Sequence, residues 1–153
     1  MLISLVSSIV VFGEQSRGVI AETKRSDKVA LAWKRTVREF YRLRERTLDQ
    51  RGTEKDVIAL LALMTDNVVY EHPRANVRMT KEQAHAGMVA HLNEGKNAHI
   101  SLQDIKAGND FIVVELTLQY ELPAKNGILE EITSKGMTIF EFGGDKIQRV
   151  AEY

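Results

Sequence analysis

The spacing of apolar and polar positions changes character part-way along this chain of 153 residues. Up to about residue 95, apolar residues recur mainly at steps of three and four, the spacing that lines one face of an α-helix. From residue 99 onward they alternate with polar residues, as in a β-strand with one buried face. This order predicts an α+β protein in which three helices precede an antiparallel sheet.

The three predicted helices each begin at a recognisable cap. Ser26 and Asp27 are candidate caps for a helix that runs to Leu48, and Thr53 opens a second helix over residues 54–64. Thr80 and Gln83 form a capping box that starts a third helix, which runs to about Asn93 and stops at Gly95. Residues at steps of three and four in the first two helices are Val29, Trp33, Val37, Phe40 and Arg44, and Val57, Leu60, Leu61 and Met64.

A short strand is predicted between the second and third helices. Asp66-Asn67 is the turn into this strand, and Pro73 stops it because proline cannot donate to a ladder. Alternation puts Val68, Tyr70 and His72 on one face.

Four longer strands are predicted over residues 99–106, 111–122, 129–142 and 146–153. The predicted turns between them are Gly108-Asn109, Asn126-Gly127 and Gly143-Gly144-Asp145, which suit hairpins. Strands this long twist strongly, so the sheet should curl around the helices. A bulge or bend is expected at Gly136.

The composition excludes several classes of function. Lys plus Arg and Asp plus Glu both number 21, so the formal net charge is zero, and neither a nucleic-acid nor a membrane partner is expected. There is no cysteine, which removes disulfides and thiolate chemistry. The four histidines form no His-x-x-x-His pair, so neither a metal nor another cofactor is expected.

The N-terminal segment, residues 1–25, is predicted to be an extension of a single domain over residues 26–153. Its first twelve residues, MLISLVSSIVVF, are too few to span a bilayer. They are interpreted as an element that packs on the domain, with a cleaved signal peptide as the alternative. A cytoplasmic location is expected.

The candidate chemistry is concentrated at the ends of two strands. His72 shares a face with Tyr70, which favours an inward, partly apolar setting, and the alternative is a half-exposed residue at a strand end. Glu152 shares a face with Val150 and lies either in a cavity wall or at the rim of the sheet. Glu115 is interpreted as solvated, because its face of the strand is mostly polar.

Two further features have ordinary interpretations. His91 shares a helix face with Met88 and can line a cavity or lie at the surface, whereas His85 lies on a different face from His91. The stretch 34–51 holds seven basic and three acidic residues, and we interpret it as a solvated face with phosphate or nucleic-acid binding as the alternative.

The segments LLALMTDNVVYEHP and MTIFEFGGDKIQRVAEY resemble the nuclear transport factor 2-like superfamily, in its branch of SnoaL-like polyketide cyclases, ketosteroid isomerase and limonene-epoxide hydrolase. The resemblance covers about residues 30–153. It implies a cystatin-like, SnoaL-like fold in which a curved antiparallel sheet forms a cone-shaped half-barrel closed by three helices. It also implies an apolar cavity and, often, a dimer.

Carried over by position, the resemblance puts His72 where the isomerase has its general base, and Thr138 where it has an oxyanion donor. The tyrosine donor of the isomerase falls near Phe40 or Tyr41. Glu152 matches the last-strand acid of the epoxide hydrolase, whereas the remaining two positions of its network fall on Glu115 and Thr117. Steroid isomerisation and epoxide hydrolysis are therefore both disfavoured.

The resulting hypothesis is a protein that binds a small hydrophobic organic molecule and, if it is an enzyme, performs cofactor-independent proton transfer on a carbonyl compound, as a cyclase, isomerase or dehydratase. His72 would be the base, Glu152 would orient it, and Tyr70 or Thr138 would stabilise negative charge. The alternative is a non-catalytic binding module with the cone filled by Phe140, Met64 and Leu92.

A homodimer through the convex sheet face around Met137 and Ile139 is also expected. The predicted ligand-binding residues are Trp33, Phe40, Tyr41, Met64, Met88, His91 and Phe140.

Overall fold

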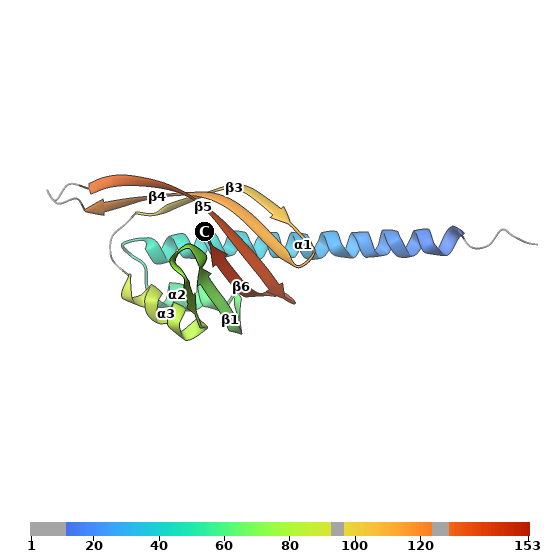
Figure 1. Ribbon diagram of the computed structural model, residues 1–153, viewed down its shortest axis with the longest axis horizontal. Coiled ribbons are helices and arrows are strands. Elements are labelled where there is room, and N and C mark those ends of the chain that lie inside the picture. The colour runs from blue at the N-terminus through green and yellow to red at the C-terminus, as the bar shows by residue number, and fades with distance from the viewer. Residues whose placement is uncertain (1–11, 93–96, 124–128) are drawn as a thin grey trace, which may run out of the picture.

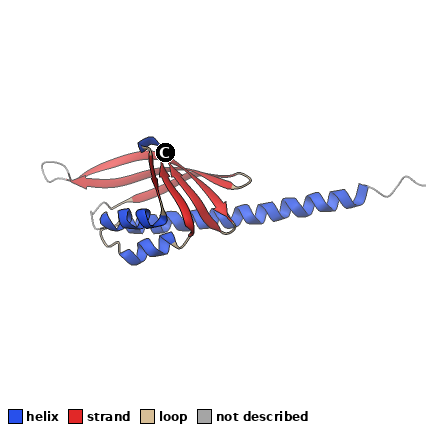
Figure 2. Ribbon diagram, turned by 60° about the horizontal axis from the view of Figure 1, so that its bottom comes forward, coloured by secondary structure: helices blue, strands red, loops and turns tan. Residues whose placement is uncertain are grey.

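The computed structural model describes residues 12–92, 97–123 and 129–153. Helix α1 (Phe12–Leu48) lies under a sheet of six strands, and the shorter helices α2 (Glu54–Leu61) and α3 (Lys81–Ala90) lie beside the end of α1 (Figure 1). The α+β class predicted from the sequence is confirmed. The sheet is open and bends across the helices, as Figure 2 shows from a second direction.

The sheet combines the predicted meander with two strands from the first half of the chain. Its order is β2-β1-β6-β5-β4-β3, with β1 parallel to β6 and every other pair antiparallel. The predicted meander is confirmed to within a residue or two at each strand end. The strands are β1 (Met64–His72), β2 (Val77–Met79), β3 (His99–Ala107), β4 (Phe111–Pro123), β5 (Leu129–Gly143) and β6 (Lys146–Glu152).

The core lies between the concave face of the sheet and the helices. Val37 and Phe40 of α1, Val57 and Leu60 of α2, and Phe140 of β5 are all fully buried. Phe40 makes edge-on contacts with Tyr41 and Phe140, with ring centroids 5.1 and 5.0 Å apart. This packing fixes α1 against the strands that carry the candidate chemistry.

Helix α1 is longer than the sequence predicts. The expected cap at Ser26 and Asp27 is wrong, because the helix passes through both residues and begins at Phe12. Serine and aspartate are strongly preferred at helix N-caps, but a cap contributes only about 1 kcal/mol, and residues 12–48 contain no proline to stop the helix. The N-terminal part of α1 projects beyond the sheet (Figures 1 and 2). Residues 1–11 lie outside the described residues.

The junction between α2 and β1 also differs from the prediction. Helix α2 ends at Leu61, and Met64 begins β1 instead of closing the helix. Asp66 and Asn67 lie inside β1, where the pairing with β6 shifts register between Met64 and Val69. This irregularity accommodates two turn-forming residues within a strand.

The other local predictions have mixed outcomes. The capping box of Thr80 and Gln83 is confirmed, and α3 ends at Ala90. The predicted helix end near Asn93 and Gly95 and the predicted turn Asn126-Gly127 lie outside the described residues, because residues 93–96 and 124–128 are not described. The expected bulge at Gly136 is absent from the β4–β5 ladder, which runs through that residue without a shift. The register shift of β5 lies instead between Glu141 and Phe142, opposite β6.

The 3-10 turn Pro73–Ala75 and the strand β2 were not predicted. Strand β1 ends at His72, as Pro73 predicts, and the 3-10 turn reverses the chain into β2. No helix among the described residues is both long and apolar enough to cross a membrane.

Candidate functional site

Tyr70, His72 and Glu152 meet at the ends of two neighbouring strands. The Tyr70 hydroxyl donates a hydrogen bond of 2.7 Å to Oε1 of Glu152. The other carboxylate oxygen, Oε2, lies 3.5 Å from Nδ1 of His72. The rings of Tyr70 and His72 are tilted against each other with centroids 5.6 Å apart. The result is a compact cluster of phenol, carboxylate and imidazole.

Strand pairing explains why these residues meet although they are about eighty positions apart in the chain. Tyr70 of β1 pairs with Val150 of β6, and Glu71 pairs with Ala151, so the next position along sets His72 beside Glu152. Strand alternation turns Tyr70 and His72 inward together. Pro73 then ends the strand, which leaves the His72 side chain 38% exposed at the rim of the sheet.

Tyr70 is held as a neutral hydrogen-bond donor. Burial raises the pKa of its phenol well above the usual range, and the negative charge of Glu152 raises that pKa further. The positive charge of Arg44 acts in the opposite direction. Because the Tyr70 hydroxyl donates its hydrogen bond to Glu152, Tyr70 fixes the orientation of this carboxylate.

Two hollows adjoin this cluster at the open end of the cone. The first, which we call the α3 hollow, has a volume of about 360 Å³ and lies between the end of α1, strands β1 and β2, and helix α3. Its wall is largely apolar. It is lined by Arg44, Thr47, Leu48, Tyr70, His72, Val77, Met79, Ala84, Gly87, Met88 and His91.

The second hollow, which we call the sheet hollow, has a volume of about 310 Å³ and lies over β4, β5 and the end of β6. It shares Arg44 and Leu48 with the α3 hollow, so the two are neighbours across that turn of α1. It is lined by Tyr41, Arg44, Leu48, Arg74, Ile100, Leu116, Leu118, Ser134, Lys135, Gly136, Met137, Thr138, Glu152 and Tyr153.

Tyr41 and Thr138 both belong to the sheet hollow. Burial raises the pKa of Tyr41 well above its usual range, while the nearby Thr138 hydroxyl lowers it in part. No hydrogen bond of normal geometry joins the Tyr41 hydroxyl to any residue that the structure describes. A buried hydroxyl without a partner is uncommon, and here it lies in the wall of a hollow.

The predicted wall residues divide into two groups. Met88, His91 and Tyr41 line the hollows. The other four, Trp33, Phe40, Met64 and Phe140, lie in the packed core and line neither hollow.

Their expected place in the cavity wall is therefore corrected to the layer beneath it. Trp33 stacks on Phe142 at 4.8 Å and donates to the Gly144 carbonyl, just after the C-terminal end of β5, whereas the sheet hollow lies over the middle of that strand. These aromatic and thioether side chains fill the space beneath the two hollows.

Arg44 is a candidate site residue that was not predicted from the sequence. It stands at an inward position of α1, in the same spacing as Val37 and Phe40, where an apolar residue is expected. A half-buried charge at such a position needs a reason, and this is the signal that could have identified it. Arg44 lines both hollows and lies close enough to Tyr41 and Tyr70 to lower the pKa of each.

Other candidate residues lie away from the hollows. Glu115 is exposed on the outer face of β4, as its polar neighbours predict. His85 faces α2, with Nε2 3.4 Å from Oε1 of Glu54. No group of three or more histidine or acidic side chains that could hold a metal occurs among the described residues.

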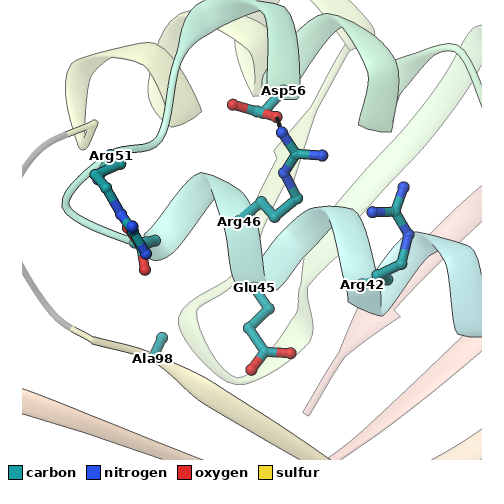
Figure 3. A pocket seen from close by; sticks show the side chains of 7 residues that line it. Arg42, Glu45, Arg46, Arg51, Asp56 and Ala98 are labelled. Atoms are coloured by element: carbon teal, nitrogen blue, oxygen red, sulfur yellow. Dashed lines mark hydrogen bonds and ion pairs between the residues drawn. The ribbon is translucent and has the colours of Figure 1, made fainter.

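Another hollow lies elsewhere, between the C-terminal end of α1, α2 and the start of β3, with a volume of about 470 Å³ (Figure 3). Its arginines already have carboxylate partners: Arg46 reaches Asp56 at 2.7 Å, and Arg51 reaches Asp49 at 3.3 Å. These charges neutralise one another at the surface, so we interpret this hollow as a solvated face, in line with the interpretation of the basic stretch 34–51. We therefore place the candidate site at the Tyr70–Glu152–His72 cluster.

The fold agrees with the comparisons to known proteins. The model of the SnoaL-like domain family matches residues 37–150, and the chain belongs to that family. No curated protein matches the chain in sequence.

Solved structures share the fold at low sequence identity. A putative SnoaL-like polyketide cyclase from Shewanella putrefaciens is 10% identical with a TM-score of 0.60, and the match covers 98% of this chain and 92% of the cyclase chain. SalBIII, an epoxide hydrolase/cyclase-like enzyme with a role in pyran ring formation in the polyether salinomycin, is 17% identical with a TM-score of 0.60, covering 78% and 88%. A cystatin-fold protein from Novosphingobium aromaticivorans is 16% identical with a TM-score of 0.59, covering 82% and 97%.

Proposed function

We propose that this protein binds a small, largely hydrophobic carbonyl compound at the open end of the cone and catalyses a cofactor-independent proton transfer on it. The observation that carries this proposal is the Tyr70–Glu152–His72 cluster beside two partly apolar hollows. The reaction class is a cyclisation, isomerisation or dehydration. Cyclase and cyclase-like neighbours in the same fold support the class without identifying the reaction.

His72 is the proposed base. Glu152 beside Nδ1 favours the tautomer with the proton on that nitrogen, so the lone pair of Nε2 is free to accept a proton. This lone pair takes a proton from the carbon next to the substrate carbonyl. The electrons of the C–H bond form a carbon–carbon double bond, and the π electrons of the carbonyl move onto its oxygen to give an enolate. The imidazolium then returns its proton to another atom of the substrate. Histidine is the side chain that most often carries out general acid–base catalysis, which suits both steps.

The supporting groups have separate roles in this proposal. Tyr70 positions Glu152 through its hydrogen bond, and Glu152 stabilises the imidazolium that forms. Thr138 and Tyr41, in the wall of the sheet hollow, supply hydroxyls for the developing oxyanion.

The proposal can be tested without knowing the natural substrate. Hydrogen–deuterium exchange next to the carbonyl of a panel of small apolar ketones, followed by proton NMR in heavy water, measures the abstraction step alone. We expect the wild type to accelerate exchange of at least one ketone and His72→Ala to lose about a hundredfold or more of that rate. His85→Ala is the matched control, because His85 contacts Glu54 and lines neither hollow. Equal rates for wild type and His72→Ala would remove His72 from the mechanism.

A non-catalytic binding module is the second candidate function. It is favoured by the filling of the narrow part of the cone by Met64 and Phe140, both fully buried, and by the partial exposure of His72. A protein of this kind would bind apolar molecules in the hollows and exchange no ketone faster than free imidazole does.

We also propose that the protein forms a homodimer through the convex face of the sheet. Met137 is 37% exposed on the outer face of β5, and Ile139 and Val113 lie beside each other on the same face. Apolar side chains in the middle of a sheet face are typical of an interface.

A further inference from the structure

Arg44 differs from the neighbouring arginines of α1 in having no carboxylate partner. Arg42 pairs with Glu39 at 2.6 Å, and Arg46 pairs with Asp56 at 2.7 Å. Arg44 faces the interior between them and forms no ion pair with any residue that the structure describes. Within the part of the chain that the structure describes, this half-buried guanidinium at the junction of two hollows therefore has no compensating carboxylate.

Such an arrangement is costly unless something else supplies the negative charge. Removing a cation partly from water costs free energy, and the cost is offset only by an anion or by several acceptors. Among the described residues that line the α3 hollow there is no carboxylate, whereas Arg44 lines it. In the sheet hollow, Arg44, Arg74 and Lys135 stand against one carboxylate, Glu152.

Glu152 is already engaged. One of its oxygens accepts the Tyr70 hydrogen bond, and the other lies beside His72. Glu152 and Arg44, both among the described residues, form no ion pair with each other, so this carboxylate does not neutralise the Arg44 guanidinium. The lining of both hollows therefore leaves an excess of positive charge around Arg44.

A second donor lies on the same face of the helix. Tyr41 precedes Arg44 by three residues, so both side chains leave α1 on one side. The Tyr41 side chain is almost completely buried, lines the sheet hollow, and has a hydroxyl without a partner among the described residues. A hydroxyl and a guanidinium that converge in this way match the two oxygens of an acid group.

We propose that the ligand of this site is an apolar organic acid whose anionic oxygens are bound by the Arg44 guanidinium and the Tyr41 hydroxyl, with its apolar part against Leu48 and Met88 in the α3 hollow. This inference rests on the proposed function, since it names the class of molecule that occupies the same site. It makes Arg44 the residue that decides specificity for acids over neutral compounds of the same shape.

The test uses two fluorescent dyes that share one scaffold. 8-Anilinonaphthalene-1-sulfonate carries an anionic group, and N-phenyl-1-naphthylamine is the same apolar molecule without it. Dissociation constants of both dyes are measured for wild type, Arg44→Met and Arg38→Met, with circular dichroism to verify that each variant is folded. Arg38→Met is the matched control, because it removes the same charge from an exposed position of α1 that lines neither hollow.

We expect the wild type to bind the anionic dye at least about tenfold more tightly than the neutral dye, as charge-assisted hydrogen bonds allow. Arg44→Met should abolish this preference by weakening the anionic dye alone, and Arg38→Met should keep it. Tyr41→Phe should reduce the preference in part.

Two results would overturn the inference, and they separate it from the proposed function. If Arg44→Met binds both dyes as the wild type does, the acid preference is wrong, while binding of apolar molecules in the hollows survives. If neither dye binds the wild type, the hollows take no such ligand, and the proposed function fails together with the inference.

Discussion

At the scale of single residues, the two buried tyrosines near the site illustrate how a partner decides the energetic role of a hydroxyl. Tyr70 and Tyr41 are 1% and 4% exposed, and burial raises the pKa of both. The Tyr70 hydroxyl donates to Glu152, whereas the Tyr41 hydroxyl has no partner among the described residues. The sequence could predict that both would be buried, but only strand pairing brings Glu152 to Tyr70.

The two tyrosines therefore give a paired prediction on stability. Tyr70→Phe should lower the free energy of unfolding by about 1 to 2 kcal/mol, because it removes a hydrogen bond to a carboxylate. Tyr41→Phe should leave it unchanged or raise it slightly, because it removes a buried polar atom that has no partner. Urea unfolding followed by circular dichroism measures both. An equal loss in the two variants would mean that the Tyr41 hydroxyl has a partner in the folded protein.

At the scale of elements, the contact of α1 with α2 depends on one aspartate. Asp56 accepts hydrogen bonds from the backbone nitrogen and the hydroxyl of Thr53 at the start of α2, and it pairs with Arg46 of α1. The Thr53 hydroxyl, the Thr53 backbone and Arg46 together lower the pKa of Asp56, against an opposing effect of burial. This carboxylate joins a helix cap to a neighbouring helix.

The lowered pKa predicts how the stability of this junction depends on pH. A carboxyl group with a depressed pKa in the folded state contributes stability above its unfolded pKa, about 4, and loses the contribution as the pH falls through its folded pKa. Asp56→Asn should therefore lower the free energy of unfolding by about 1 kcal/mol near neutral pH, the usual size for a lost helix cap. The difference from wild type should shrink below about pH 3.

Asp66→Asn is the control for this prediction. Lys81 lowers the pKa of Asp66 by a hydrogen bond, but the Asp66 side chain is fully exposed, so water screens the pair. Urea unfolding at the two pH values should give a clearly smaller effect for Asp66→Asn. If the loss in Asp56→Asn were equally large in acid, the charge of Asp56 would not be its cause.

Element boundaries were predicted less well than element types, and the reasons are local. Met64 continues the helical spacing of Val57, Leu60 and Leu61, yet it begins β1, because pairing with Ile147 of β6 outweighs helix periodicity there. In the same way, Ser26 and Asp27 have the character of caps but lie inside α1. Short-range preferences of about 1 kcal/mol or less are easily outweighed by packing.

At the scale of the whole molecule, the sheet separates two chemically different surfaces. Its inner face carries the core and the candidate site, and its outer face carries a chain of charges across four strands. Arg149 contacts Glu141 and Glu71, and Arg78 continues from Glu71 at 3.5 Å. The apolar residues Met137, Ile139 and Val113 lie beside this network.

The proposed dimer predicts a mass of twice the chain in light scattering at micromolar concentration. Ile139→Lys should shift the protein toward monomer, because it places a charge in the apolar part of the outer face. Thr133→Lys, which adds the same charge at an exposed position of the same strand that lines neither hollow, is the control for general effects of substitution there. A wild-type protein that remains monomeric under these conditions would contradict the dimer.

The sequence by itself determined the α+β class, the long antiparallel strands, and the facing of Tyr70 and His72 to one side, because these follow from periodicity and turn chemistry within short segments. It also singled out His72 and Glu152 as candidates, partly through the resemblance to a family. Only the tertiary structure decided that β1 lies parallel to β6, that Glu152 meets Tyr70 and His72, and that Arg44 stands between two hollows. Such contacts join residues that are far apart in the chain. Their energies depend on which strands and helices become neighbours, and no short segment of sequence determines that arrangement.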